Sequence, residues 1–173
     1  MEEIIRQVYA QWRVVKEQAR QECDSRSLPN MAEKYRMCEM FKGTEDLQSL
    51  IRLFTSPQGM EFCIRHRFPN IATFRLFKPF NPEKYGVYID AGIITLKNPG
   101  KAVLIGRTSA TVNCDTLERH EVFLLHGAKA FINASGWAVV SVKGSTGCQQ
   151  IRNVSGLSLI HISEPTRQEA ISY

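Results

Sequence analysis

The sequence has 173 residues, of which 43% are hydrophobic and 23% charged, and its formal net charge is +5. This length allows one ordinary domain or two small ones, with the composition of a soluble globular protein. No apolar run approaches the roughly 20 residues of a membrane helix, and the first residues, Met1 to Ile5, lack the basic start and apolar core of a secretory signal. We therefore predict a cytoplasmic protein with no membrane partner.

The cysteines support the same interpretation. They are Cys23, Cys38, Cys63, Cys114 and Cys148. Their number is odd, and no Cys-x-x-Cys or Cys/His ligand spacing occurs. The sequence thus predicts reduced, mostly buried thiols in the cytoplasm, and neither a disulfide framework nor a metal site.

The first element is an amphipathic helix over residues 3–22. Its apolar positions recur at steps of three and four residues, with charged residues between them. They are Ile4, Ile5, Val8, Trp12, Val15 and Ala19. We expect this stripe to pack on neighbouring helices, because glutamates dilute the positive charge that a membrane-surface or nucleic-acid helix would carry.

Further short helices are predicted from cap residues up to residue 78. Asn30 would cap a helix over residues 31–41, and Thr44 the next one, with its apolar stripe from Leu47 to Phe54. Ser56 followed by Pro57 opens another helix, and Asn70 caps the last, over residues 71–78. Residues 1–78 are therefore expected to be an all-helical unit, joined by a proline-containing linker at 79–86 to the second half of the chain.

Short helices with capped turns also occur in DNA-binding proteins. The charges of residues 1–85 are interspersed in sign, whereas a DNA-binding domain shows a clustered basic face. The best cluster is Arg65 and Arg67, with Arg75 and Lys78 nearby. We favour a solvated basic edge, and nucleic-acid contact by these four residues is the alternative.

Residues 128–142 indicate the architecture of the second half. Small or aliphatic side chains occupy every even position, which predicts strands with one buried face. They are Ala128, Ala130, Ile132, Ala134, Gly136, Ala138, Val140 and Val142. So many alanines suit a layer in which backbones approach closely, and residues 102–114 repeat the pattern.

An internal repeat refines this prediction. Residues 103–114 align without gaps on residues 123–134, at an offset of twenty residues, which is the length of a solenoid coil. Asn113 and Asn133 fall at the same place and would form a ladder. We predict an α+β chain in which residues 87–156 form a short β-solenoid of the right-handed β-helix type. The alternative is a small antiparallel β-sandwich or roll, whose core would require more Leu, Val and Phe.

No motif for catalysis stands out, because phosphate loops, nucleophile elbows, metalloprotease helices and calcium loops are all missing from the sequence. Asp115, Glu118, His120 and Glu121 share one polar loop, 115–121, from which an acid/base or metal cluster could be built. We favour a solvated loop, with an enzyme that uses it as the alternative. No catalytic, metal or cofactor-binding residue is predicted. Phe131, Trp137 and Val139 interrupt the polar outer face, and we expect helices to pack there. The alternative is an exposed aromatic patch formed by Tyr85, Tyr88, Phe131 and Trp137.

The last segment, residues 157–173, resembles the in-frame translation of a transposase-type sequencing adapter. Leu157 to Arg167 fit its fixed arm, and Ile171 to Tyr173 fit the next fixed segment after an index-sized gap. The sequence therefore predicts a non-native tail here and a native chain that continues past Gly156. Fold prediction excludes such segments.

Three stretches carry a resemblance to known sequences. They are Tyr85–Gly92, His126–Ala130 and Asn133–Val140. With the helical start, residues 1–156 resemble uncharacterised proteins encoded on phages and conjugative elements of gut bacteria. The resemblance implies no catalytic residue. We therefore favour a non-enzymatic binding or assembly module of a bacterial mobile-element accessory protein, with a protein partner or self-association, and nucleic acid as an alternative partner.

Overall fold

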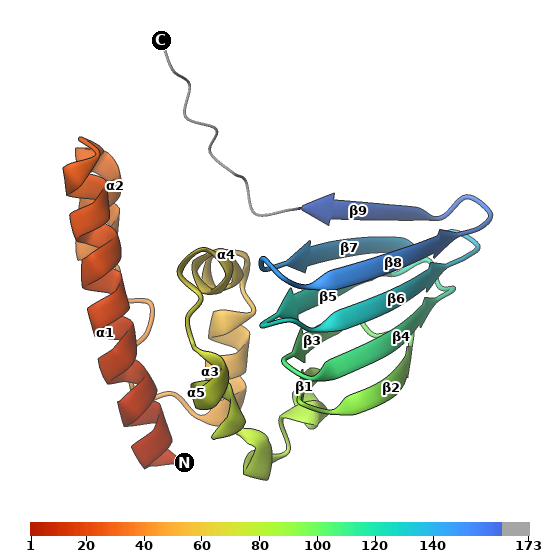
Figure 1. Cartoon of the computed structure of the whole chain (residues 1–173), viewed down its shortest axis with the longest axis horizontal. Helices are drawn as coiled ribbons and strands as arrows, with labels where there is room; N and C mark the ends of the chain where they lie inside the picture. Colours follow the sequence, from red (N-terminus) through yellow and green to blue (C-terminus); the bar gives the residue numbers. More distant parts are fainter. Residues whose placement is uncertain (164–173) are drawn as a thin grey trace. The chain divides into compact units, whose positions relative to one another are not determined.

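The computed structural model describes residues 1–163 (Figure 1). Helices occupy the N-terminal part and parallel strands the rest, so the predicted α+β class is confirmed. The chain divides into a helical unit, Met1–Phe80, and a second unit that begins at Asn81.

The helical unit has five α-helices and a 3-10 turn among its described residues. They are α1 (Glu2–Ser25), α2 (Pro29–Arg36), α3 (Leu47–Phe54), α4 (Pro57–His66), α5 (Ile71–Arg75) and η1 (Lys78–Phe80). The face of α1 that carries Val8 and Trp12 is buried, as its periodicity predicts. A second 3-10 turn, η2 (Pro82–Tyr85), begins the other unit.

The caps of the later helices follow from local chemistry. The side chain of Ser56 accepts a hydrogen bond from the N–H of Gly59, and that of Asn70 accepts one from Thr73, so both predicted caps are confirmed. Thr44 as the cap of α3 was wrong. Asp46 has that role, because its carboxylate reaches the N–H of Ser49 at 2.7 Å.

The helix predicted over residues 31–41 is shorter, and Asn30 does not cap it. It begins at Pro29, whose missing N–H suits the first turn, and ends at Arg36. The residues after Arg36 are not helical, and Phe41 among them is buried. The centre of its ring lies 5.8 Å from that of Trp12. Burial of an aromatic ring in the core outweighs the weak helical propensity of a short polar segment.

The second unit contains nine strands in its described part. They are β1 (Val87–Ile89), β2 (Gly92–Lys97), β3 (Lys101–Ile105), β4 (Thr108–Cys114), β5 (Arg119–Leu125), β6 (Lys129–Ala134), β7 (Val139–Gly144), β8 (Gln149–Val154) and β9 (Leu159–Ser163). Odd-numbered strands form one sheet, in the order β1-β3-β5-β7-β9, and even-numbered strands form the other, β2-β4-β6-β8. We call these sheet A and sheet B.

Every strand pair in the described residues is parallel and joins a strand to its counterpart one coil later. The offset is sixteen residues in the first coil, as from Val87 to Val103, and twenty thereafter, as from Val103 to Phe123. The predicted β-solenoid and its twenty-residue repeat are therefore confirmed, and the alternative of an antiparallel sandwich or roll is wrong.

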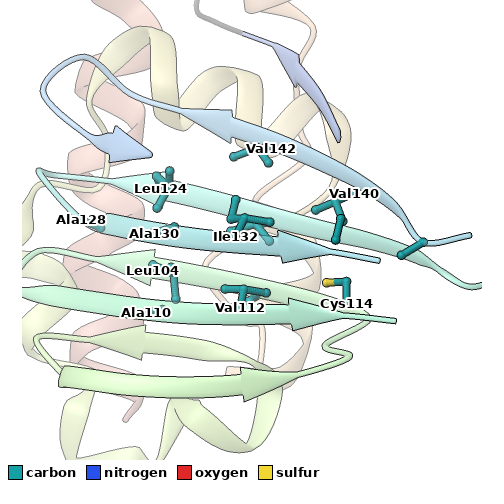
Figure 2. Close-up of a cluster of buried hydrophobic side chains, with 14 residues drawn as sticks. Leu104, Ala110, Val112, Cys114, Leu124, Ala128, Ala130, Ile132, Val140 and Val142 are labelled. Atoms are coloured by element: carbon teal, nitrogen blue, oxygen red, sulfur yellow. The ribbon is translucent and has the colours of Figure 1, made fainter. Parts of the chain in front are cut away.

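The core of this unit is the space between the two sheets (Figure 2). Alanines of sheet B, such as Ala110 and Ala130, lie in the same cluster as larger side chains of sheet A, such as Leu104 and Leu124. This pairing of small with large residues fills a thin layer without voids. Most even positions predicted to be buried from residue 102 to residue 142 do line this core. The prediction was wrong for Gly136, which is exposed in the turn before β7 because the chain reverses there with a positive φ of 65°.

The last coil differs from those before it. Gln150 and Arg152 pair with Ala130 and Ile132, so polar residues occupy two core-facing register positions in β8. The Oε1 atom of Gln150 is buried and has no hydrogen-bond partner in the described part of the chain. Residues 159–163, within the segment that resembles an adapter, form β9 on β7. The remainder of that segment, 164–173, lies outside the described residues.

Candidate functional site

His120 lies at the polar loop but does not face solvent. It is the first core-facing residue of β5, and its ring is fully buried. Nδ1 lies 2.9 Å from the carbonyl oxygen of Pro99, and Nε2 lies 3.2 Å from Oγ1 of Thr116. Both ring nitrogens thus have partners within the fold, so this histidine fastens a turn to a strand and has no free nitrogen for acid/base chemistry.

The acidic residues of the same loop do not converge on a common point. Glu121 forms ion pairs with Lys101, at 3.8 Å, and Arg119, at 3.3 Å. Asp115 is exposed and accepts a hydrogen bond from the amide of Asn98, and Glu118 is exposed too. In the described part of the chain, no group of three His, Cys, Asp or Glu residues could hold a metal ion. This geometry counts against catalysis by the loop.

The four basic residues singled out in the helical unit are all exposed. Arg65 lies in the last turn of α4, and Arg67 ends that helix with a left-handed φ of 51°. Arg75 is the last residue of α5, and Lys78 the first of η1. Neither Arg65 nor Arg67 has an acidic partner among the described residues, so their charges are available to an anionic ligand.

A polar contact beside these residues links α2 to α4. The hydroxyl of Tyr35 lies 3.2 Å from Nε2 of His66, and the two rings meet edge to face. Burial lowers the pKa of His66, as does the neighbouring charge of Arg65, and burial also raises the pKa of Tyr35. Burial and the charge of Arg65 therefore favour the neutral form of His66.

The cysteines offer little reactivity. Cys23, Cys63 and Cys114 are buried and none of the five forms a disulfide. Burial raises the pKa of the Cys63 thiol, and burial together with the nearby carboxylate of Asp115 raises the pKa of Cys114 to about 11. Few thiolates would form at neutral pH at these two sites, which makes them poor nucleophiles.

One edge of the solenoid carries a column of exposed apolar side chains. The turns 115–118 and 135–138 lie between strands paired at an offset of twenty, so Leu117 and Trp137 occupy equivalent positions in consecutive coils. Leu117 is 80% exposed and Trp137 61%, and Val139 follows at 40%. We call these three residues the apolar edge. Leu157 continues the column within the segment that resembles an adapter.

Phe131, Trp137 and Val139, over which helices are expected to pack, are exposed within the described residues, at 40%, 61% and 40%. Sheet A has buried outward side chains in four of its strands. They are Val87 and Ile89 of β1, Val103 and Ile105 of β3, Phe123 and Leu125 of β5, and Ser141 of β7. The sequence contained a signal for those of β3 and β5, since these strands are apolar at consecutive positions instead of alternating, as strands buried on both faces are.

Sheet B has the opposite character, since its outer face is polar and open. Its outward residues are Ile93, Thr95 and Lys97 of β2, Ser109, Thr111 and Asn113 of β4, Lys129, Phe131 and Asn133 of β6, and Gln149, Ile151 and Asn153 of β8. All of them are at least partly exposed. The predicted asparagine ladder is present here, with Nδ2 of Asn133 donating to Oδ1 of Asn113 at 2.8 Å.

In the described residues, no helix combines the length and apolar character that a membrane span requires. Comparisons of the chain with models of known protein families, with curated proteins and with solved structures gave no match.

Proposed function

We propose that the chain is a non-enzymatic binding or assembly module, in which the β-solenoid is a rigid scaffold for surface side chains. The observation that carries this proposal is the apolar edge. Trp137 projects from a four-residue turn held by the strands on both sides, with Leu117 at the equivalent position one coil earlier. Exposed, pre-organised tryptophans are typical of the centres of protein interfaces.

The partner that this edge suits best is a protein surface, including a second copy of the chain. Its three side chains are apolar, and the charges around it are of both signs, with Glu118 and Arg119 both exposed. A nucleic acid would gain little there, because no cluster of basic residues within residues 1–163 surrounds the tryptophan.

Sedimentation velocity over a range of protein concentrations tests the assembly form of this proposal. We expect concentration-dependent association, weakened roughly tenfold or more by the pair Leu117→Ser and Trp137→Ser, as at interface hot spots. Val14→Ser is the matched control, because Val14 is a comparably exposed apolar residue on α1. A chain that stays monomeric at every concentration, or an equal effect of the control, contradicts self-assembly through this edge.

Nucleic-acid binding by the helical unit is a second candidate, supported by the unpaired charges of Arg65 and Arg67. Affinity for duplex DNA would then fall steeply with salt, and changing both arginines to Glu would abolish it. Absence of binding even at low salt would remove this candidate.

The biological setting is also a proposal. The sequence resemblance supports an accessory protein of a bacterial mobile element, and five free cysteines support a cytoplasmic location. The genes that flank this one test the first point. Phage or conjugation genes on both sides are expected, and a neighbourhood of chromosomal housekeeping genes would contradict it.

A further inference from the structure

The outer face of sheet B is electrostatically one-sided. Among its twelve outward residues are Lys97 and Lys129 and no acidic residue. Neither lysine has an ion-pair or hydrogen-bond partner among the described residues. The nearest acid along β4 is Asp115, which follows the strand and is engaged by the amide of Asn98 at 2.6 Å. Such a face attracts anionic ligands.

An aromatic ring lies between Lys129 and the column of amides, and Lys97 begins that column as the register partner of Asn113. Phe131 is 40% exposed, and its register partners are Thr111 on one side and Ile151 on the other. It shares β6 with Lys129 and with Asn133, both of which are two residues away and on the same face. A flat ring is thus flanked by a cation and by an amide.

The asparagine ladder borders this ring and offers polar groups. The amide of Asn133 is committed to Asn113, whereas the side chain of Asn153 has no hydrogen-bond partner among the described residues. Amides donate and accept hydrogen bonds, so they suit the edges of nucleobases as well as peptide groups.

We propose that the outer face of sheet B binds single-stranded nucleic acid. A base stacks on Phe131, Lys97 and Lys129 contact phosphates, and the amides of the ladder contact base edges. This inference rests on the proposed function of a binding module and names the ligand class of a second surface. An acidic peptide could use the lysines and the amides but would leave the aromatic ring without a role.

Fluorescence anisotropy of a labelled oligouridine, titrated with the full chain at about 50 mM salt, tests the electrostatic part. The pair Lys97→Glu and Lys129→Glu is expected to weaken binding by about tenfold or more and to reduce the slope of log affinity against log salt by about 1.4. The matched control is Lys34→Glu with Lys42→Glu, which reverses two exposed charges in the helical unit and should change little.

Substitutions of the ring test stacking. Phe131→Leu keeps an apolar side chain without a ring and should weaken binding roughly 5- to 150-fold, whereas Phe131→Trp should retain it. Because Phe131 faces outward and is partly exposed, both variants are expected to fold, and their circular dichroism spectra provide the check.

Four outcomes would overturn the proposal. The first two are that the chain does not bind oligouridine at low salt, or that the sheet B lysine pair and the control pair lose equal affinity. The other two are that only changes at Arg65 and Arg67 reduce the affinity, or that polyglutamate binds as tightly as oligouridine. Equal effects of Phe131→Leu and Phe131→Trp would also overturn it. None of these results bears on association through Trp137, so the proposed function and this inference fail separately.

Discussion

At the residue scale, cap and turn positions follow most closely from local chemistry. Ser56 and Asn70 were predictable because each precedes a helical pattern and can accept a hydrogen bond from an N–H three residues ahead. Thr44 met the same criteria and was wrong. Glu45 explains the difference, since its carboxylate accepts hydrogen bonds from the N–H groups of Lys42, Gly43 and Thr44 and holds that segment as a loop.

The burial of His66 gives the helical unit a pH dependence. Burial lowers the pKa of His66, with Arg65 adding to the effect and Glu22 opposing it, so folding favours the neutral ring. The stabilisation is present above the unfolded pKa of about 6.5 and is lost as pH falls below that value towards the folded pKa.

The variant His66→Gln should remove this dependence. Between about pH 7 and pH 5 the melting temperature of the wild type should fall relative to that of the variant. The fluorescence of Trp12 in a Trp137→Phe background reports on the helical unit alone. Parallel melting curves across that range would contradict the assignment.

At the element scale, strand alternation was predictable, because successive side chains point to opposite faces. The consecutive apolar residues of β5 also indicated that Phe123 is buried. The exposure of Trp137 was not predictable, because no pattern in its turn indicates whether another segment covers it. The same holds for Phe41, which is buried from within a loop.

A substitution within one strand tests the narrow core. Ala130→Leu places a larger side chain between the sheets and should cost roughly 1–3 kcal/mol of unfolding free energy. Lys129→Leu introduces leucine at the adjacent outward position and should change the unfolding free energy by about 0.5 kcal/mol or less. Urea denaturation measures both, and similar losses at the two positions would contradict the observed burial of Ala130.

For the whole molecule, the twenty-residue repeat was the feature that predicted the fold. It aligns Asn113 with Asn133, and the two residues are register partners in the sheet. The shorter first coil was not predicted, because Asn98 and its neighbours form a tighter turn than the loop 115–118 and the repeat signal begins only after it. The candidate surfaces were less predictable. The exposure of Phe131 depends on what covers sheet B, and that of Trp137 on what covers the turn 135–138.

The pairing of residues twenty apart can be measured directly by nuclear Overhauser contacts in the isotope-labelled protein. The solenoid predicts parallel-strand contacts between the amide and α protons of coil neighbours, as along Thr111, Phe131 and Ile151. Strong contacts between the α protons of sequence-adjacent strands, such as β4 and β5, would mean antiparallel hairpins and would contradict the solenoid.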